Sequence, residues 1–170
     1  RWAAVTFLDL TATDLFAGGG GATEGLTQSG FRVLVAANHW DLALATHSLN
    51  HPGIEHRSDN LSEVNWRTFP TTDLLWASPS CVWHSPAGGR KKLPAEVELR
   101  REDAGAIDRA TAFAVIAAAE VHRYPIILVE NVPYFAKWVL FQWWLNGLRA
   151  LGYRIEIRTL NAKDFGNGQD

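Results

Sequence analysis

The stretch TATDLFAGGGGATEGL, Thr11 to Leu26, decides the fold that this sequence predicts. Its first half is apolar and β-prone, and the four glycines Gly18 to Gly21 prevent the strand from continuing. A helix is expected from about Ala22 to Ser29, with its free N–H groups directed back at the glycines. A strand, a glycine turn and a helix N-terminus are the usual means by which an α/β protein brings its backbone close to a nucleotide-like ligand.

The spacing of the glycines disfavours one such ligand. If Gly18 and Gly20 are the first two glycines of a dinucleotide-binding fingerprint, the third position is occupied by Thr23. The pattern therefore argues against pyrophosphate binding. It leaves open a loop that holds a nucleoside without phosphates.

Apolar strands alternate with amphipathic helices along the rest of the chain. Further strands are expected at 31–37, 55–57, 72–77, 126–129 and 153–160, and further helices end at Leu49 and span 107–124 and 134–151. This alternation predicts an α/β fold with a mostly parallel sheet and helices on both faces. Ligands of such a sheet bind beyond the carboxyl ends of its strands. Those ends carry the segments 18–21, 39–41, Asp59, 78–81 and 130–131.

The composition is that of one globular domain. The chain has 170 residues, of which 47% are hydrophobic and 20% charged. The net charge of −2 gives no global basic field for nucleic acid, so such a partner must be held by a local patch or by parts outside this sequence. The single cysteine excludes an internal disulfide framework and fits a reducing cytoplasm. No signal peptide or membrane span is visible, and because the sequence lacks methionine we expect it to be a piece of a longer protein.

Two side chains at predicted strand ends suit nucleophilic chemistry. Most single cysteines are small buried thiols, but Cys81 lies in a polar loop with Pro79 and Pro86, which favours a reactive nucleophile. Glu130 ends an apolar strand, where a carboxylate is expected to be partly desolvated; alternatively it caps the turn before Pro133. Together they would form a nucleophile with an acid partner.

These residues resemble the DNA cytosine-5 methyltransferases, which use S-adenosylmethionine. The resemblance is by motif, covers nearly all of the chain after Asp9, and follows the family's order. Asp14 to Gly21 resembles the first cofactor motif, and Ser80 to Ser85 the nucleophile loop. The remaining matches are the ribose and adenine segment 38–41, the aspartate segment 58–59, the glutamate motif 130–132 and the start of a later motif at 160–169.

The resemblance implies a Rossmann-like S-adenosylmethionine-dependent methyltransferase fold and assigns the site. The implied cofactor-binding residues are Phe16, Gly18, Gly20, His39, Trp40, Asp59 and Pro79. The implied catalytic residues are Cys81, Glu130, Asn131 and Ser85, with Asn131 holding the loop and Ser85 contacting a phosphate or the loop. The implied substrate is double-stranded DNA with its target cytosine flipped out of the helix.

Several positions depart from the family pattern. His39 replaces the usual ribose-binding acid, Val82 the usual glutamine, and Gly168 a usual proline, while Pro79 lies two residues before the cysteine instead of one. The sequence ends at Asp170, before the family's arginines and target-recognition domain. We therefore interpret residues 1–170 as an incomplete cofactor-binding and catalytic domain, truncated at its C-terminus. We expect it to fold alone but not to methylate DNA alone.

Two other functions stay open at this stage. One is a catalytically inactive domain that binds S-adenosylmethionine or DNA within a larger or split assembly, where a second chain supplies the missing region. The other is a nicotinamide-dependent oxidoreductase, which the glycine spacing disfavours. A metal site at His47 and His51 is not expected, because no third ligand is evident. The run 90–92, Arg-Lys-Lys, is either a solvated loop or a contact to DNA phosphates, and the expected location is the cytoplasm of a bacterial host cell.

Overall fold

The computed structural model describes residues 9–80 and 109–166. Cys81 and Ser85 of the expected nucleophile loop therefore lie outside the described residues. The strands are β1 (Thr11–Leu15), β2 (Arg32–Asn38), β3 (Glu55–Ser58), β4 (Leu74–Ala77) and β5 (Ile126–Val129). The α-helices are α1 (Gly21–Gln28), α2 (Asp41–Asn50), α4 (Phe113–His122) and α5 (Phe141–Ala150), and the 3₁₀ helices are η1 (Trp66–Thr68), η3 (Pro133–Lys137) and η4 (Ala162–Phe165).

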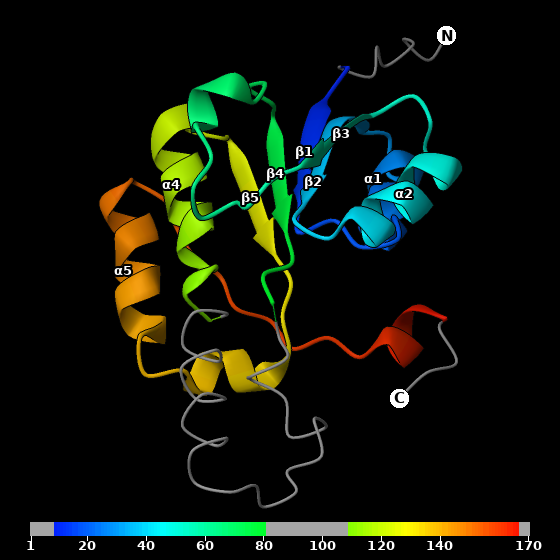
Figure 1. Ribbon diagram of the computed structural model, residues 1–170. Helices are drawn as coiled ribbons and strands as arrows, with labels where there is room; N and C mark the ends of the chain where they lie inside the picture. The colour runs from blue at the N-terminus through cyan, green and yellow to red at the C-terminus, as the bar shows by residue number, and fades with distance from the viewer. Residues whose placement is uncertain (1–8, 81–108, 167–170) are drawn as a thin grey trace, which may run out of the picture.

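The strands form one five-stranded sheet in the order β3-β2-β1-β4-β5. Each pair of neighbouring strands is parallel, so all the carboxyl ends lie along one edge of the sheet. Helices α1 and α2 cover one face, and α4 and α5 cover the other (Figure 1). The predicted α/β fold with a parallel sheet and helices on both faces is confirmed.

The two faces of the sheet bury separate apolar clusters. Leu15 and Val35 pack with the side chains of α4 and α5, whereas Ala12 and Val33 pack with Leu26 of α1. Val33 and Val35 are two positions apart on β2, which normally places both on one face. The register between β1 and β2 shifts at this point, because Ala12 pairs with Val33 and its neighbour pairs with Val35. This bulge lets one short strand contribute valines to both clusters.

The helix expected at 134–151 is two elements, η3 and α5. Trp138, between them, has an extended backbone with ψ 132°. The buried aromatic side chains Phe135, Trp138 and Phe141 recur at every third position, which suits the three-residue turn of a 3₁₀ helix better than an α-helical face. None of the helices within 9–80 and 109–166 is long and apolar enough to cross a membrane.

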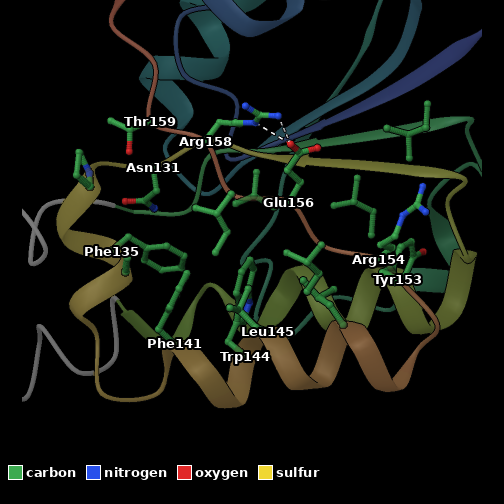
Figure 2. A pocket seen from close by; sticks show the side chains of 18 of the residues that line it. Asn131, Phe135, Phe141, Trp144, Leu145, Tyr153, Arg154, Glu156, Arg158 and Thr159 are labelled. Atoms are coloured by element: carbon green, nitrogen blue, oxygen red, sulfur yellow. Dashed lines mark hydrogen bonds and ion pairs between the residues drawn. The ribbon is translucent and has the colours of Figure 1, made fainter.

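The expected strand at 153–160 is wrong. This segment alternates apolar and charged residues as a strand does, but it has no ladder partner among the described residues. A cavity of about 620 Å³ separates it from β5, the edge strand, and is lined from both sides (Figure 2). Figure 2 shows Phe135, Phe141 and Trp144 on one side of the cavity, facing Glu156 and Arg158 on the other. An alternating pattern predicts a strand only where a neighbour accepts its hydrogen bonds, and the cavity occupies that place.

Candidate active site

The topology itself indicates where a ligand binds. From β1 the chain proceeds outward to β2 and β3, and it then returns to the other side of β1 to form β4 and β5. The connections after β1 and β4 therefore leave the sheet in opposite directions, and ligands of α/β proteins bind in the crevice at such a switch point. Here the switch point lies between the ends of β1 and β4, where the glycine loop and the segment 78–80 leave the sheet.

Phe16 begins the glycine loop in a strained conformation. Its φ of 61° lies in the left-handed region, which a bulky side chain rarely adopts. The next residue, Ala17, is fixed on both sides: its N–H donates to the Ala37 carbonyl at 3.0 Å, and its own carbonyl accepts from Asn38 Nδ2 at 2.7 Å. Such over-determined strain is typical of functional sites. The loop then exposes Gly18 and Gly19 to solvent at the sheet edge.

The far end of α2 holds the same loop from the other direction. Asn50 Nδ2 donates to the Gly19 carbonyl at 3.3 Å, and His51 Nε2 donates to the Gly20 carbonyl at 3.2 Å. Gly20 has a φ of 108°, and a Cβ built there would lie 2.7 Å from the His51 ring. Only glycine fits at this position. The loop backbone is therefore fixed by α2 as well as by β2.

The ends of β2 and β3 place three predicted cofactor residues. His39 is exposed, and Trp40 leaves 59% of its surface in solvent where α2 begins. Asp59 is half-buried, its N–H donates to the Asn38 carbonyl at 3.1 Å, and its Oδ2 accepts from Arg57 Nε at 2.8 Å. The segments that carry His39 and Asp59 are thus joined through the backbone of Asn38.

The ends of β4 and β5 are joined in the same way. Asn131 Nδ2 donates to the carbonyl of the buried Pro79 at 2.9 Å, and the Glu130 N–H donates to the Ala77 carbonyl at 3.0 Å. The segment that leads to Cys81 is therefore adjacent to the segment that carries Glu130. One expectation is corrected here: the Glu130 side chain is exposed, not desolvated. The reason is that β5 is the edge strand of the sheet in the described part of the chain, and its outer side is open.

These residues fit S-adenosylmethionine. Its adenine needs an apolar face, and Trp40 offers an indole in solvent beside the half-buried Asp59. Its methionine part needs close approach to a backbone, and a Cβ built at Gly18 or Gly21 would meet no atom within 4 Å. Gly20 begins α1 without any side-chain cap, and among the N–H groups of the first turn that of Thr23 is directed to Asp14.

Sequence reasoning missed a group of buried polar residues behind the loop. Asp14, Thr23 and His47 are fully or almost fully buried, and hydrogen bonds connect them in series. They come from β1, α1 and α2, so only the spacing of His47 and His51 was visible in the sequence. Within residues 9–80 and 109–166, no cluster of His, Cys, Asp and Glu has the geometry to hold a metal ion.

Comparison with known proteins assigns the chain to a family. The model of the C-5 cytosine-specific DNA methylase family matches residues 10–170. The chain belongs to that family. It is 32% identical over 161 residues to Type II methyltransferase M2.BsuMI of Bacillus subtilis (strain 168), covering 92% of this chain and 39% of that relative. It is 30% identical to Type II methyltransferase M.HhaI of Haemophilus parahaemolyticus, covering 90% of this chain and 44% of that relative.

Solved structures give the same fold. A putative DNA modification methyltransferase encoded within an E. coli prophage superposes with a TM-score of 0.63 at 20% identity, over 83% of this chain and 38% of that one. The S. pombe Dnmt2 methyltransferase superposes with a TM-score of 0.60 at 20% identity, over 83% and 40%. The fold is that of the S-adenosylmethionine-dependent methyltransferases, as the motifs predicted. The chain spans less than half the length of these relatives.

Proposed function

We propose that the complete protein transfers a methyl group from S-adenosylmethionine to C5 of cytosine in DNA. The observation that carries the proposal is the hydrogen bond between Asn131 and Pro79. It places the segments of the glutamate and the nucleophile together, one strand away from the strained glycine loop. Family membership supplies the reaction class, and this edge of the sheet supplies a site that suits it.

The cofactor would be held at the ends of β1, β2, β3 and β4. Phe16, Gly18 and Gly20 would surround its methionine and ribose parts, with Pro79 beside them. Trp40 would stack on the adenine, Asp59 would accept a hydrogen bond from the adenine amino group, and His39 would contact the ribose. When bound, S-adenosylmethionine supplies the electrophilic methyl group.

The chain's own residues would activate the base. Cytosine C5 is too weak a nucleophile by itself. The Cys81 thiolate would add to C6 and form a covalent bond that makes C5 enamine-like, while Glu130 holds N3 and stabilises the charge that develops there. Once C5 carries the methyl group, loss of the C5 proton to a base breaks the C6–S bond and releases the Cys81 thiolate. Because Glu130 is exposed at the sheet edge, its carboxylate is accessible to an incoming base.

Double-stranded DNA would be the partner, with the cytosine flipped out of the stack. Flipping costs a few kcal/mol, which contacts to the flanking duplex must offset. Within this sequence the basic run 90–92 and Ser85 are the candidates for phosphate contacts. A target-recognition region outside this sequence, or on a second chain, would supply the rest.

DNA carrying 5-fluorocytosine tests the proposal, because fluorine at C5 blocks the final elimination. The complete protein, with labelled S-adenosylmethionine, should form a covalent complex with that DNA. Cys81→Ser should abolish the complex, whereas Ser48→Ala, a change on the exterior of α2, should retain it. A complex that survives Cys81→Ser would contradict the assignment of the nucleophile.

The second candidate is an inactive domain that binds S-adenosylmethionine or DNA within a larger or split assembly. The exposed His39, in place of the family's acid, favours it. Labelled S-adenosylmethionine that binds tightly without any methyl transfer to mixed-sequence DNA, even in the complete protein, would support this candidate. Binding of a nicotinamide cofactor in its place would contradict both candidates.

A further inference from the structure

A chain of hydrogen bonds runs behind the glycine loop through four elements. Asp14 Oδ2 on β1 accepts from Thr23 Oγ1 on α1 at 2.8 Å. Thr23 Oγ1 lies 3.0 Å from His47 Nε2 on α2, and His47 Nδ1 lies 2.8 Å from His56 Nε2 on β3. Asp14 Oδ1 is buried and has no hydrogen-bond partner among the residues that the structure describes. Each of the three links contains an atom that donates or accepts according to where the protons lie.

This chain also reaches the loop that would hold the cofactor. The His47 ring packs against the His51 ring at an interplanar angle of 55°, with ring centroids 4.9 Å apart, and His51 Nε2 donates to the Gly20 carbonyl at 3.2 Å. Thr23 lies in the first turn of α1, which begins where the loop ends. His47 is therefore linked to the end of the glycine loop at two points, to Gly20 through His51 and to the first turn of α1 through Thr23.

We propose that His47 is a positioning residue of the S-adenosylmethionine site, and that the protonation of Asp14 sets the direction of the hydrogen-bond chain through it. This inference rests on the proposed function only for the identity of the cofactor. It assigns no contact with substrate to either residue. Both act through the glycine loop.

The donor directions follow from the chemistry of the groups. When Asp14 is ionised it accepts from the Thr23 hydroxyl, so His47 must donate from Nε2 and accept at Nδ1 from His56. When Asp14 is protonated it can donate to Thr23 Oγ1. Thr23 then donates to His47 Nε2, the His47 proton moves to Nδ1 and is donated to His56 Nε2, and the proton of His56 moves from its Nε2 to its Nδ1. One proton at Asp14 thus selects the tautomer of His47.

The surroundings of Asp14 and His47 allow the change of His47 tautomer to occur within an accessible range of pH. Burial raises the pKa of Asp14 to about 6, although the hydroxyl and backbone N–H of Thr23 oppose the shift. Burial, with His56 and His51 nearby, lowers the pKa of His47 to about 4, so His47 stays neutral while Asp14 titrates. The register neighbours of Asp14 on β2 and β4 are Ala36 and Trp76, which do not titrate.

The positive charge of the cofactor determines whether protonation of Asp14 raises or lowers the affinity for it. S-adenosylmethionine carries a sulfonium, which favours the ionised form of Asp14, two residues before Phe16. By linkage its affinity falls as Asp14 becomes protonated. If only the ionised form of a group with a pKa of about 6 supports binding, the affinity for the cofactor falls about fourfold when the pH is lowered from 7.5 to 5.5.

Histidine ¹⁵N NMR of the full-length protein tests the chain without any cofactor. His47, assigned by the signal lost in His47→Gln, should carry its proton on Nε2 at pH 7.5 and on Nδ1 at pH 5. In Asp14→Asn the tautomer should not change with pH. A single tautomer across this range in the wild type, or a change that persists in Asp14→Asn, would overturn the inference.

Cofactor affinity gives the second readout, with labelled S-adenosylmethionine as the probe. All proteins compared, including the reference, carry His39→Gln, so that position 39 has the same neutral side chain throughout. We expect a fourfold loss at pH 5.5 that Asp14→Asn abolishes. At pH 7.5, His47→Phe should weaken binding about tenfold, while His47→Gln, whose amide can donate to Thr23, should stay within about twofold.

A failure of the proposed function can be distinguished from a failure of this inference. If S-adenosylmethionine does not bind the wild type at any pH, the proposed function fails while the NMR result still decides this inference. If the cofactor binds and His47→Phe and His47→Gln weaken it equally, His47 has only a packing role and the inference is wrong.

Discussion

Asn131 joins the end of β5 to the end of β4 with both ends of its amide. Its Nδ2 donates to the Pro79 carbonyl at 2.9 Å, and its Oδ1 accepts from the Val132 N–H at 2.9 Å. Glu130 precedes Asn131, and Cys81 follows Pro79 by two residues. The amide is therefore the described contact that fixes the spacing between the two segments of the proposed chemistry.

Asn131→Ala should slow methyl transfer more than it weakens cofactor binding. We expect kcat to fall about tenfold, equivalent to about 1.4 kcal/mol, because the variant loses both hydrogen bonds and frees the Pro79 segment. The dissociation constant for S-adenosylmethionine should stay within about twofold. Asn146→Ala is the matched control, since its exposed side chain accepts a hydrogen bond from Arg149 on the same helix, α5. An unchanged kcat in Asn131→Ala would remove this residue from the site.

His39→Glu should retain or improve the affinity for S-adenosylmethionine. Neutral imidazole exchanges one hydrogen bond with a ribose hydroxyl, whereas a carboxylate can accept two. His39 is exposed, so the change requires no repacking of the core. Calorimetry on the two proteins measures the difference. A loss of tenfold or more, about 1.4 kcal/mol, would show that His39 has a role of its own.

Asp14→Asn should change how stability depends on pH. The pKa of Asp14 is raised from 3.8 to about 6, so the folded state binds this proton more tightly than the unfolded state. The contribution of Asp14 to wild-type stability therefore falls as pH rises from about 4 to about 6, and is constant above that range. Relative to the wild type, Asp14→Asn should gain about 2 kcal/mol in unfolding free energy between pH 4 and 7.5.

Asp73 provides a control of opposite sign. Its carboxylate accepts from the N–H and the hydroxyl of Thr11, both at 2.8 Å, and these hydrogen bonds lower its pKa. Its ionised form stabilises the folded state above the unfolded pKa, and this contribution is lost as pH falls. Asp73→Asn should therefore lose stability relative to the wild type as pH rises from 3 to 5. If denaturant titrations gave both variants the same sign, the assignment of the Asp14 shift would be wrong.

The fold was predictable where the signal is local. The glycines after β1, the apolar runs of β2, β4 and β5, and the caps of the helices each depend on neighbouring residues, and all lie where expected within a few positions. The parallel order followed from their alternation with helices. The segments at the carboxyl ends therefore converged as predicted, apart from Cys81 and Ser85, which lie outside the described residues.

The features that could not be predicted from the sequence depend on contacts between residues that are far apart in the chain. The alternation at 153–160 fits a strand, but pairing requires a neighbour, and none of the described strands lies beside it. Glu130 follows four apolar residues, yet it is exposed because β5 lies at the edge. Asp14, Thr23 and His56 are each unremarkable in sequence, and only the fold brings them to His47.

Two glycine substitutions test the role of the glycine loop, one at Gly20 at the end of the loop and one at Gly25 in the helix that follows. Gly20 has a φ of 108°, and an added Cβ would lie 2.7 Å from the His51 ring that holds the loop. Gly25 lies within α1, and a Cβ there would meet no atom within 4 Å. Gly20→Ala should therefore destabilise the protein by about 1–2 kcal/mol through backbone strain alone, and more through displacement of His51. Gly25→Ala should stabilise it by about 0.5–1 kcal/mol.

Cofactor affinity then separates the role of the loop from its stability. Gly20→Ala should weaken S-adenosylmethionine binding at least tenfold even at a temperature where the variant is fully folded, because the Gly20 carbonyl leaves His51 and the start of α1 moves. Gly25→Ala, one turn further along the same helix, should bind as the wild type does. Equal affinity in the two variants would show that the conformation of Gly20 serves the fold and not the ligand, and the cofactor site would then have to be sought away from this loop.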